Sequence, residues 1–274
     1  MARRLGILAG GGRLPSLLVE AGRASGLDPF VLCLEGSAEP ADFARVPHAL
    51  SPVAKVGRIV ETLKEAGCTD LVLAGRMTRP DFKSMMPDLR GMKLLPRLLA
   101  AKGDDAILRA VIEDLESEGF RVLGVDDVLA DLLAPLGAVG ARTPDPQAEA
   151  DMARGVAVLG ALGTLDVGQA VTVQDGIVLG IEAAEGTDGL LERTRNLVKP
   201  GRGGVLVKLR KSGQERRADL PAIGTETIAR VAAAGLSGIA VEAGGALIID
   251  RKAVARAADE AGLFVVGVAA ERRG

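Results

Sequence analysis

Acidic side chains gather at one turn in the second half of the chain. The segment IEAAEGTDGLLERT places Glu182 and Glu185 before a Gly-Thr step, with Thr187 and Asp188 at its end. Thr187 or Asp188 is enough to cap the helix that the sequence predicts next, so capping needs neither glutamate. Because Mg²⁺ prefers oxygen ligands and keeps several waters, Glu182, Glu185 and Asp188 are candidate ligands for that ion. Thr187 either hydrogen-bonds a phosphate or caps its helix.

A further acid, Asp219, follows a run of cations and stands directly before Leu-Pro. The basic side chains that precede it are Lys208, Arg210, Lys211, Arg216 and Arg217. Asp219 either forms an ion pair with one of them or acts as a general base or metal ligand in a phosphate-binding site. Cations near a diphosphate neutralise developing charge, and an aspartate can orient or deprotonate an attacking water.

The sequence offers no nucleophile elbow and no Ser-His or Cys-His pair that would support covalent catalysis. Zinc is disfavoured because the single histidine, His48, is expected in a loop (RVPHAL) far from any cluster of acids and cysteines. Metal-assisted attack by water is therefore the more natural chemistry for these residues.

Three glycines, Gly10, Gly11 and Gly12, separate an apolar run from a helical one in AGGGRLP. Such a loop lets the backbone approach a pyrophosphate at a helix N-terminus. The match to G-x-G-x-x-G is incomplete, because Pro15 takes the place of the third glycine, while Glu35 ends the next predicted strand where a ribose-binding acid would stand. The loop either contacts a phosphate or is a tight turn that needs glycine.

Two other polar segments stand at the ends of predicted elements. In LAGRMTRPDF, Arg76 and Arg79 follow a strand at the carboxyl edge of the predicted sheet, where open parallel sheets bind ligands. They are either phosphate receptors or solvated loop charges. In KGDDAILR, Asp104 is expected to cap a helix, which leaves Lys102 and Asp105 to face a ligand.

Residues 82–99, FKSMMPDLRGMKLLPRLL, combine methionines with arginines and lysine. Flexible apolar side chains edged with cations suit an acyl chain and its membrane, and they suit ordinary core or loop packing equally well.

Composition limits the class of protein. The chain has 274 residues, with 48% apolar and only 2% aromatic side chains, so a core must be built from Leu, Val, Ile and Ala. The balance of 34 basic and 36 acidic residues, with few aromatics, excludes a typical nucleic-acid binder. Cys33 and Cys68 are expected to be small buried residues in a reducing cytoplasm. Without an apolar run long enough to span a membrane, the sequence predicts a soluble protein.

The elements that must position these residues divide the chain in two, and the predicted fold class is α/β. Short apolar strands alternate with helices over residues 1–133, which predicts a Rossmann-like parallel sheet. Residues 134–147 are rich in Pro, Gly and Ala and are expected to form a linker. Residues 148–274 are expected to form an α+β catalytic domain with a mixed sheet. Hairpins are predicted across Asp175-Gly176 and across Gly244-Gly245.

An ordered set of segments from residue 6 to about 268 resembles a known family. The segments are GILAGGGRLP, LAGRMTRP, KGDDAILR, GFRVLGV, IEAAEGTDGLLERT, GVLVKLRK, ADLPAIG and GLSGIAVEAGGALIIDR. They are similar to the landmarks of the UDP-2,3-diacylglucosamine pyrophosphatases of bacterial lipid A biosynthesis that are unrelated to calcineurin-type phosphoesterases.

The resemblance implies a cytoplasmic, Mg²⁺-dependent hydrolase that associates peripherally with the inner membrane. It would cleave UDP-2,3-diacylglucosamine into UMP and 2,3-diacylglucosamine 1-phosphate (lipid X) by directing water at the sugar-side phosphorus. It also implies two domains with the lipid between them, and a homodimer. The family's essential aspartate falls on Asp219. Where the family usually reads K-P-x-Q-D after GVLVK, this chain has Lys211-Ser212-Gly213-Gln214-Glu215, so Glu215 keeps the charge but the proline is missing.

Together these arguments assign three kinds of site residue. The predicted catalytic residues are Asp219, Asp188 and Lys208. The predicted substrate-binding residues are Gly10, Gly11, Gly12, Arg76, Lys102, Asp105 and Thr187. The predicted metal ligands are Asp219, Glu182, Glu185 and Asp188. An NAD(P)-linked oxidoreductase built on AGGGRLP and a non-catalytic carrier of an acylated sugar phosphate are the alternative functions.

Overall fold

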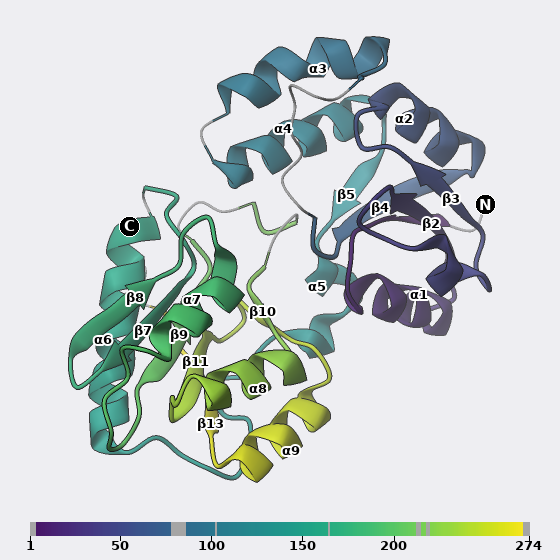
Figure 1. The fold of residues 1–274 in the computed structure, drawn as a ribbon. Helices are drawn as coiled ribbons and strands as arrows, with labels where there is room; N and C mark the ends of the chain where they lie inside the picture. Colours follow the sequence, from purple (N-terminus) through teal and green to yellow (C-terminus); the bar gives the residue numbers. More distant parts are fainter. Residues whose placement is uncertain are drawn as a thin grey trace. The chain divides into compact units, whose positions relative to one another are not determined.

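The computed structural model describes residues 4–77, 86–101, 103–163, 165–211, 215–217 and 220–270 (Figure 1). The chain forms two compact units. The first runs to Ala130 and also contains residues 215–217, and the second takes the chain from Asp131 onward apart from that segment. Asp219, Lys102 and Arg79, all singled out by the sequence, lie outside the described residues.

A five-stranded parallel sheet forms the centre of the first unit. Its strands are β1 (Arg4–Ala9), β2 (Asp28–Leu34), β3 (His48–Ser51), β4 (Cys68–Ala74) and β5 (Arg121–Leu123), in the order β3-β2-β1-β4-β5. The strand order reverses direction between β1 and β4, as in doubly wound sheets. The Rossmann-like fold predicted for this half is confirmed. His48, which the sequence suggested to be in a loop, begins β3.

Helices cover both faces of this sheet. They are α1 (Leu14–Ala24), α2 (Val56–Glu65), α3 (Leu89–Ala100), α4 (Asp104–Ser117) and α5 (Val125–Val128), with a 3₁₀ turn η1 (Pro40–Phe43). A core of Leu, Ile, Val and Phe side chains joins α2 and α4 to one face of the sheet, α1 packs on the other, and α3 lies outside α2 and α4 (Figure 1). Asp104 does not cap α4: Gly103, at φ 97°, precedes the helix, and Asp104 is its first residue.

A six-stranded mixed sheet forms the centre of the second unit, as predicted. Its strands are β6 (Gly137–Ala138), β7 (Ala170–Gln174), β8 (Ile177–Ile181), β9 (Val205–Lys208), β11 (Gly238–Glu242) and β13 (Phe264–Val268), in the order β6-β13-β11-β9-β7-β8. β9, β11 and β13 are parallel, whereas β7 is antiparallel to both β8 and β9. β6 lies within the stretch 134–147 and pairs with β13. A 3₁₀ turn, η2 (Ala130–Leu132), precedes β6.

One predicted hairpin is confirmed and the other is wrong. β7 and β8 pair across Asp175 and Gly176, which adopt positive φ angles of 51° and 75°. β11, in contrast, does not pair with β12 (Leu247–Ile248) across Gly244. Both edges of β11 are already occupied by β9 and β13, so the chain leaves the sheet, and β12 pairs in parallel with β10 (Ala222–Ile223) instead.

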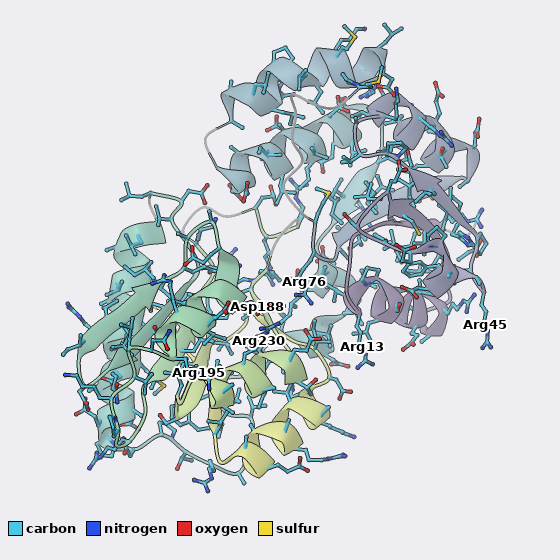
Figure 2. All side chains as sticks on the ribbon, in the orientation of Figure 1. Arg13, Arg45, Arg76, Asp188, Arg195 and Arg230 are labelled. Atoms are coloured by element: carbon cyan, nitrogen blue, oxygen red, sulfur yellow. The ribbon has the colours of Figure 1, made fainter. Side chains whose placement is uncertain are left out.

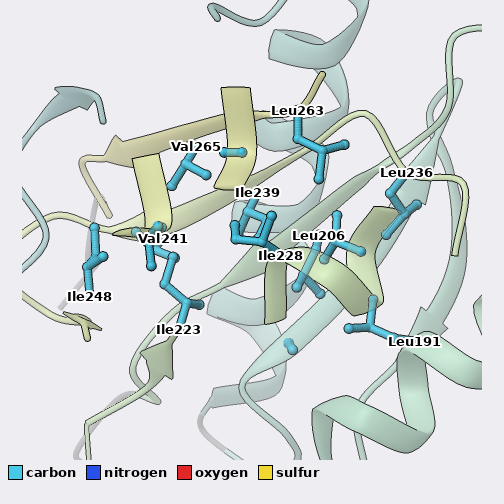
Figure 3. Packing of buried hydrophobic residues seen from close by; sticks show 14 of the residues in the cluster. Leu191, Leu206, Ile223, Ile228, Leu236, Ile239, Val241, Ile248, Leu263 and Val265 are labelled. Carbon is cyan, nitrogen blue, oxygen red and sulfur yellow. The ribbon is translucent and has the colours of Figure 1, made fainter. Parts of the chain in front are cut away.

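The mixed sheet is also covered on both faces. Its helices are α6 (Pro146–Gly163), α7 (Gly186–Thr194), α8 (Thr225–Ala233) and α9 (Arg251–Ala261). Ile228 of α8 packs against Leu206, Ile239 and Val241 of the sheet in an all-aliphatic core (Figure 3). α6 packs on the opposite face with its own core. The low aromatic content is thus compensated by close packing of branched aliphatic side chains.

The close contact between α6 and β9 generates a stability prediction. A Cβ atom built at Gly155 of α6 would lie 2.5 Å from Cγ2 of Val207, whereas one built at Gly160 of the same helix meets nothing within 4 Å. Gly155→Ala should therefore destabilise the protein by ~1–3 kcal/mol through overpacking. Gly160→Ala should stabilise it by up to ~1 kcal/mol, because alanine loses less backbone entropy in a helix.

Urea unfolding followed by circular dichroism measures both variants, since the chain has no tryptophan for fluorescence. Equal or higher stability of Gly155→Ala relative to Gly160→Ala would contradict this packing.

Candidate active site

Three buried charged side chains lie at one edge of the mixed sheet in the second unit. β8 and β9 run in the same direction, because each is antiparallel to β7, and β11 is parallel to β9. Glu182, Lys208 and Glu242 stand at the carboxyl ends of these strands and are 6%, 5% and 6% exposed. Charged groups are rarely buried unless they are paired and hydrogen-bonded, so their partners define what this edge can do.

A continuous hydrogen-bond chain joins Lys208 to Glu182 through Thr187. Nζ of Lys208 donates to Oγ1 of Thr187 at 2.9 Å and to the carbonyl of Ala222 at 3.4 Å. Oγ1 of Thr187 donates to Oε1 of Glu182 at 2.9 Å, and the backbone N–H of Gln169 donates to Oε2 at 3.0 Å. The structure therefore brings together three predicted site residues, with an ammonium group beside the carbonyl of β10. Such a group can neutralise a phosphate oxygen.

Glu182, Glu185 and Asp188 do not converge in the described structure. Glu185 pairs with Arg193 at 2.9 Å, and Asp188 pairs with Arg230 at 3.2 Å. Figure 2 shows Asp188 of α7 beside Arg230 of α8. A hydrogen bond from its own backbone N–H, together with the Arg193 guanidinium, holds the pKa of Glu185 below its ordinary value.

The predicted capping at this turn is wrong, and the three predicted metal ligands that the structure describes, Glu182, Glu185 and Asp188, do not share a site. Glu185 occupies the cap position of α7 but makes no side-chain cap hydrogen bond, and Thr187 turns back to Glu182. Within the ranges that the structure describes, no three acidic, cysteine or histidine side chains form a group suited to a metal ion. Each of the three carboxylates contacts a cation, a hydroxyl or a backbone N–H instead, so they do not by themselves make a Mg²⁺ site.

Glu242 belongs to this edge but was not among the predicted residues. Its Oε2 accepts a hydrogen bond from the backbone N–H of Arg210 at 2.9 Å. A Cβ atom at Gly245 would lie 2.3 Å from the Glu242 carboxyl carbon, so glycine is needed where this side chain folds back. The sequence signal was present in VEAGG, an acid at the end of a buried strand followed by two glycines.

The three glycines after β1 lie at the switch point of the parallel sheet in the first unit. Gly11 and Arg76 exchange backbone hydrogen bonds of 2.8 Å in both directions, which joins the loop after β1 to the loop after β4. A Cβ atom at Gly10 would lie 2.6 Å from the Arg76 carbonyl oxygen, and one at Gly75 would lie 2.7 Å from the carbonyl carbon of Gly10. Gly10 and Gly75 are therefore required by close backbone approach.

Gly12 differs from its neighbours, because a Cβ atom there would meet nothing within 4 Å. Its positive φ of 96°, which other residues rarely adopt, is the reason that glycine is needed at this position. Gly12 and Arg13 are exposed before α1, and Arg76 is exposed on the facing loop. Figure 2 labels Arg13 and Arg76 on these two loops. An exposed glycine, a helix N-terminus and two guanidinium groups at a switch point form an arrangement suited to an anion.

Asp105 serves a structural contact rather than facing outward to a ligand as predicted. Its carboxylate accepts a hydrogen bond from the backbone N–H of Glu215 and pairs with Arg109 at 2.8 Å. The side chain is only 16% exposed, since the segment 215–217 covers it. The sequence could not reveal this contact because 110 residues separate the two partners.

The same segment, 215–217, is fixed to the first unit by further ion pairs. Arg217 pairs with Glu116 at 2.6 Å and with Glu215 at 2.9 Å, and Arg216 pairs with Asp126. Hydrogen bonds from Arg217 hold the pKa of Glu215 below its ordinary value of 4.5. The Glu215 carboxylate therefore orders its own segment, while the backbone N–H of Glu215 and the side chains of Arg216 and Arg217 join the segment to the first unit.

The fold and the site define a two-unit α/β protein, with a glycine switch-point loop in the first unit and a buried charged sheet edge in the second. A family model described as the LpxI N-terminal domain matches residues 4–132, and one described as the LpxI C-terminal domain matches residues 135–266. The chain belongs to the LpxI family. It is 44% identical over 279 residues to a protein of Caulobacter vibrioides named UDP-2,3-diacylglucosamine pyrophosphatase LpxI, and the alignment covers 99% of each chain.

Among the described residues, no helix has the length and apolar character required to cross a bilayer.

The hydroxyl of Thr187 is expected to be essential to the buried hydrogen-bond chain. Thr187→Val removes one partner each from the Lys208 ammonium and the Glu182 carboxylate, so it should lower the free energy of unfolding by about 1–3 kcal/mol. Thr187→Ser keeps the hydroxyl and should retain most of that stability. Urea unfolding of the two variants tests the difference, and equal losses would show that the hydroxyl link contributes nothing.

The Glu215 contacts predict a pH dependence. Because the folded-state pKa of Glu215 is lowered, its contribution to stability is fully present above the ordinary value of 4.5 and is lost as the pH falls through the lower folded value. Glu215→Gln should thus reduce stability at neutral pH by about 1–3 kcal/mol, and the difference from wild type should narrow below pH 4.5.

Glu113→Gln is the matched control, because the ion pair between Glu113 and Arg97 is about half exposed on both sides and should contribute little. A wild-type advantage over Glu215→Gln that persists unchanged at the lowest pH would contradict the ionic role of Glu215.

Proposed function

We propose that this protein hydrolyses UDP-2,3-diacylglucosamine to UMP and 2,3-diacylglucosamine 1-phosphate, lipid X, in lipid A biosynthesis. The observation that carries the proposal is the 44% identity to the Caulobacter enzyme across 99% of both chains. In the second unit, the buried Lys208, supported by Thr187 and Glu182, provides a cationic group for an anionic, diphosphate-bearing substrate.

In the proposed reaction, water attacks the sugar-side phosphorus, a new P–O bond forms, and the anhydride P–O bond breaks with UMP as the leaving group. Asp219 orients the water and accepts its proton. Lys208 neutralises charge that develops on the phosphate oxygens, and its ammonium is held in place by Thr187 and the carbonyl of Ala222. The N–H groups of Gly10 and Gly11 already donate to the carbonyls of Ala74 and Arg76, so the exposed Gly12 and the start of α1 contact the nucleotide or sugar phosphate.

Lys102 as a phosphate ligand stays a prediction from the segment KGDDAILR. Mg²⁺ dependence, a homodimer and a cytoplasmic location at the inner-membrane surface stay predictions that the resemblance implies. If Mg²⁺ is required, Asp219 and the substrate's own phosphates would bind it, because Glu182, Glu185 and Asp188 make other contacts. Asp188, exposed and paired with Arg230, is then a weaker candidate for catalysis than Lys208.

Release of UMP from UDP-2,3-diacylglucosamine in mixed micelles tests the proposal. Wild type should release UMP and lipid X in equal amounts, and EDTA should stop the reaction if Mg²⁺ is needed. Asp219→Asn should lower kcat about 10²- to 10⁴-fold, because the water loses its base. In ¹⁸O-labelled water, the label should enter the phosphate of lipid X.

Asp42→Asn, an exposed aspartate of η1, is the matched control and should retain wild-type turnover. No UMP from wild type, with lipid that co-purifies, would favour a non-catalytic carrier. A thermal shift with NAD(P) but not with the nucleotide lipid would favour the oxidoreductase. Turnover of Asp219→Asn within a few-fold of wild type would move the chemistry to another residue.

A further inference from the structure

Helix α3 in the first unit is apolar on two faces, and only one of them is packed against the residues that the structure describes. Its inner face has Gly91 and Leu94 buried, with Leu95 and Leu98 partly buried beside them. Gly91 lies so close to the preceding chain that a Cβ atom there would be 2.6 Å from the carbonyl oxygen of Ala54. This face fixes the helix to its own unit, so the outer face is not needed to hold α3 in place.

The outer face carries a stripe of large apolar side chains at helical spacing. Leu89, Met92 and Leu99 are 81%, 58% and 59% exposed, and Met86, just before the helix, is 81% exposed. Pro96, also exposed, completes the row at positions i, i+3, i+7 and i+10. Scattered exposed apolar residues are normal, but a contiguous row on one helix marks an interaction surface.

Cations border this stripe on one side. The helix contains Arg90, Lys93 and Arg97 and no acidic residue from Leu89 to Ala100. Arg90 turns inward to Asp114 and Glu118 on and beside α4. Lys93 and Arg97 are exposed next to the apolar row, and Arg97 also pairs with Glu113 of α4. A helix with an apolar face beside a basic edge is suited to the interface of a membrane with anionic headgroups.

We propose that the outer face of α3, formed by Met86, Leu89, Met92, Pro96 and Leu99 with Lys93 and Arg97 at its edge, docks on the surface of an anionic lipid bilayer. The proposal rests on the proposed function, in that a diacylated sugar substrate resides in such a bilayer. A second copy of the chain fits less well. One helix face offers far less than the ~800 Å² per partner that stable interfaces bury, and paired copies would bring like charges together.

Sedimentation with vesicles, in the absence of substrate, tests this surface independently of catalysis. Wild type should bind vesicles made from equal parts of phosphatidylcholine and phosphatidylglycerol, and bind more weakly to phosphatidylcholine alone. The triple variant Leu89→Ser, Met92→Ser, Leu99→Ser should lose about tenfold or more of its partitioning, because the apolar side chains no longer enter the interface. Lys93→Glu should lose binding only where phosphatidylglycerol is present.

A matched triple variant, Leu136→Ser, Leu165→Ser, Ile177→Ser, removes apolar side chains of the second unit that are 73%, 69% and 57% exposed. It should bind vesicles as wild type does. UMP release from detergent-dispersed substrate should be unchanged in both triple variants, which separates membrane docking from the proposed chemistry. The single variant Lys93→Glu provides the test if the α3 triple variant does not fold.

Three outcomes would overturn the proposal. The first is undiminished vesicle binding by the α3 triple variant and Lys93→Glu. The second is a fall in the oligomeric state of the α3 variant, by light scattering, with vesicle binding intact, which would identify the face as a contact between copies. The third is a raised KM for dispersed substrate with vesicle binding intact, which would assign the stripe to an acyl chain of the substrate itself.

Discussion

The second unit is organised around the burial of an ammonium and a carboxylate at the same sheet edge. Glu182 and Lys208 lose nearly all contact with water, and a buried charge of either sign is expensive unless it is hydrogen-bonded. The Thr187 hydroxyl contacts both charged groups: it donates to the Glu182 carboxylate and accepts from the Lys208 ammonium. The backbone N–H of Gln169 also donates to the carboxylate, and the carbonyl of Ala222 also accepts from the ammonium. The positions of β8, β9 and the start of α7 are therefore coupled through a single hydroxyl group.

Glycines make this arrangement sterically possible. At Gly168, where φ is 57°, a Cβ atom would lie 2.1 Å from the carbonyl oxygen of Glu182. Gly155 likewise lets α6 approach Val207, next to Lys208 in β9, and Gly245 leaves room for Glu242. In the first unit, Gly10 and Gly75 allow the loops after β1 and β4 to meet backbone to backbone at the switch point. The absence of a side chain at each position is what allows charged groups and loops to be held rigidly.

The segment 215–217 gives the chain an unusual path. It belongs to the first unit although the residues before and after it belong to the second. Its ion pairs with α4 and α5 hold residues 215–217 to the first unit, and the Glu215 carboxylate accepts hydrogen bonds from the side chain and the backbone N–H of Arg217.

The sequence by itself determined the two-part α/β architecture, the parallel sheet with its glycine loop, the turn at Asp175-Gly176 and the membership of the family. These features depend on local periodicity, turn chemistry and ordered motifs, which are readable along the chain. It also indicated Glu182, Thr187 and Lys208 as candidate site residues. Only the tertiary structure shows that these three side chains contact one another. It also shows that Glu185 pairs with Arg193 and that Asp188 pairs with Arg230. Asp105, in turn, accepts a hydrogen bond from the backbone N–H of Glu215.

Tertiary structure likewise decided that β12 pairs with β10 and which apolar face of α3 packs against the described part of the chain. The physical reason is common to all these cases. Which side chains meet depends on strand order and on the partners available at each edge or face, and the partners of one residue lie up to 110 positions away in the chain. Residue types state what chemistry is possible, whereas the sheet register and the packing of the helices select which charges are paired, buried or left exposed.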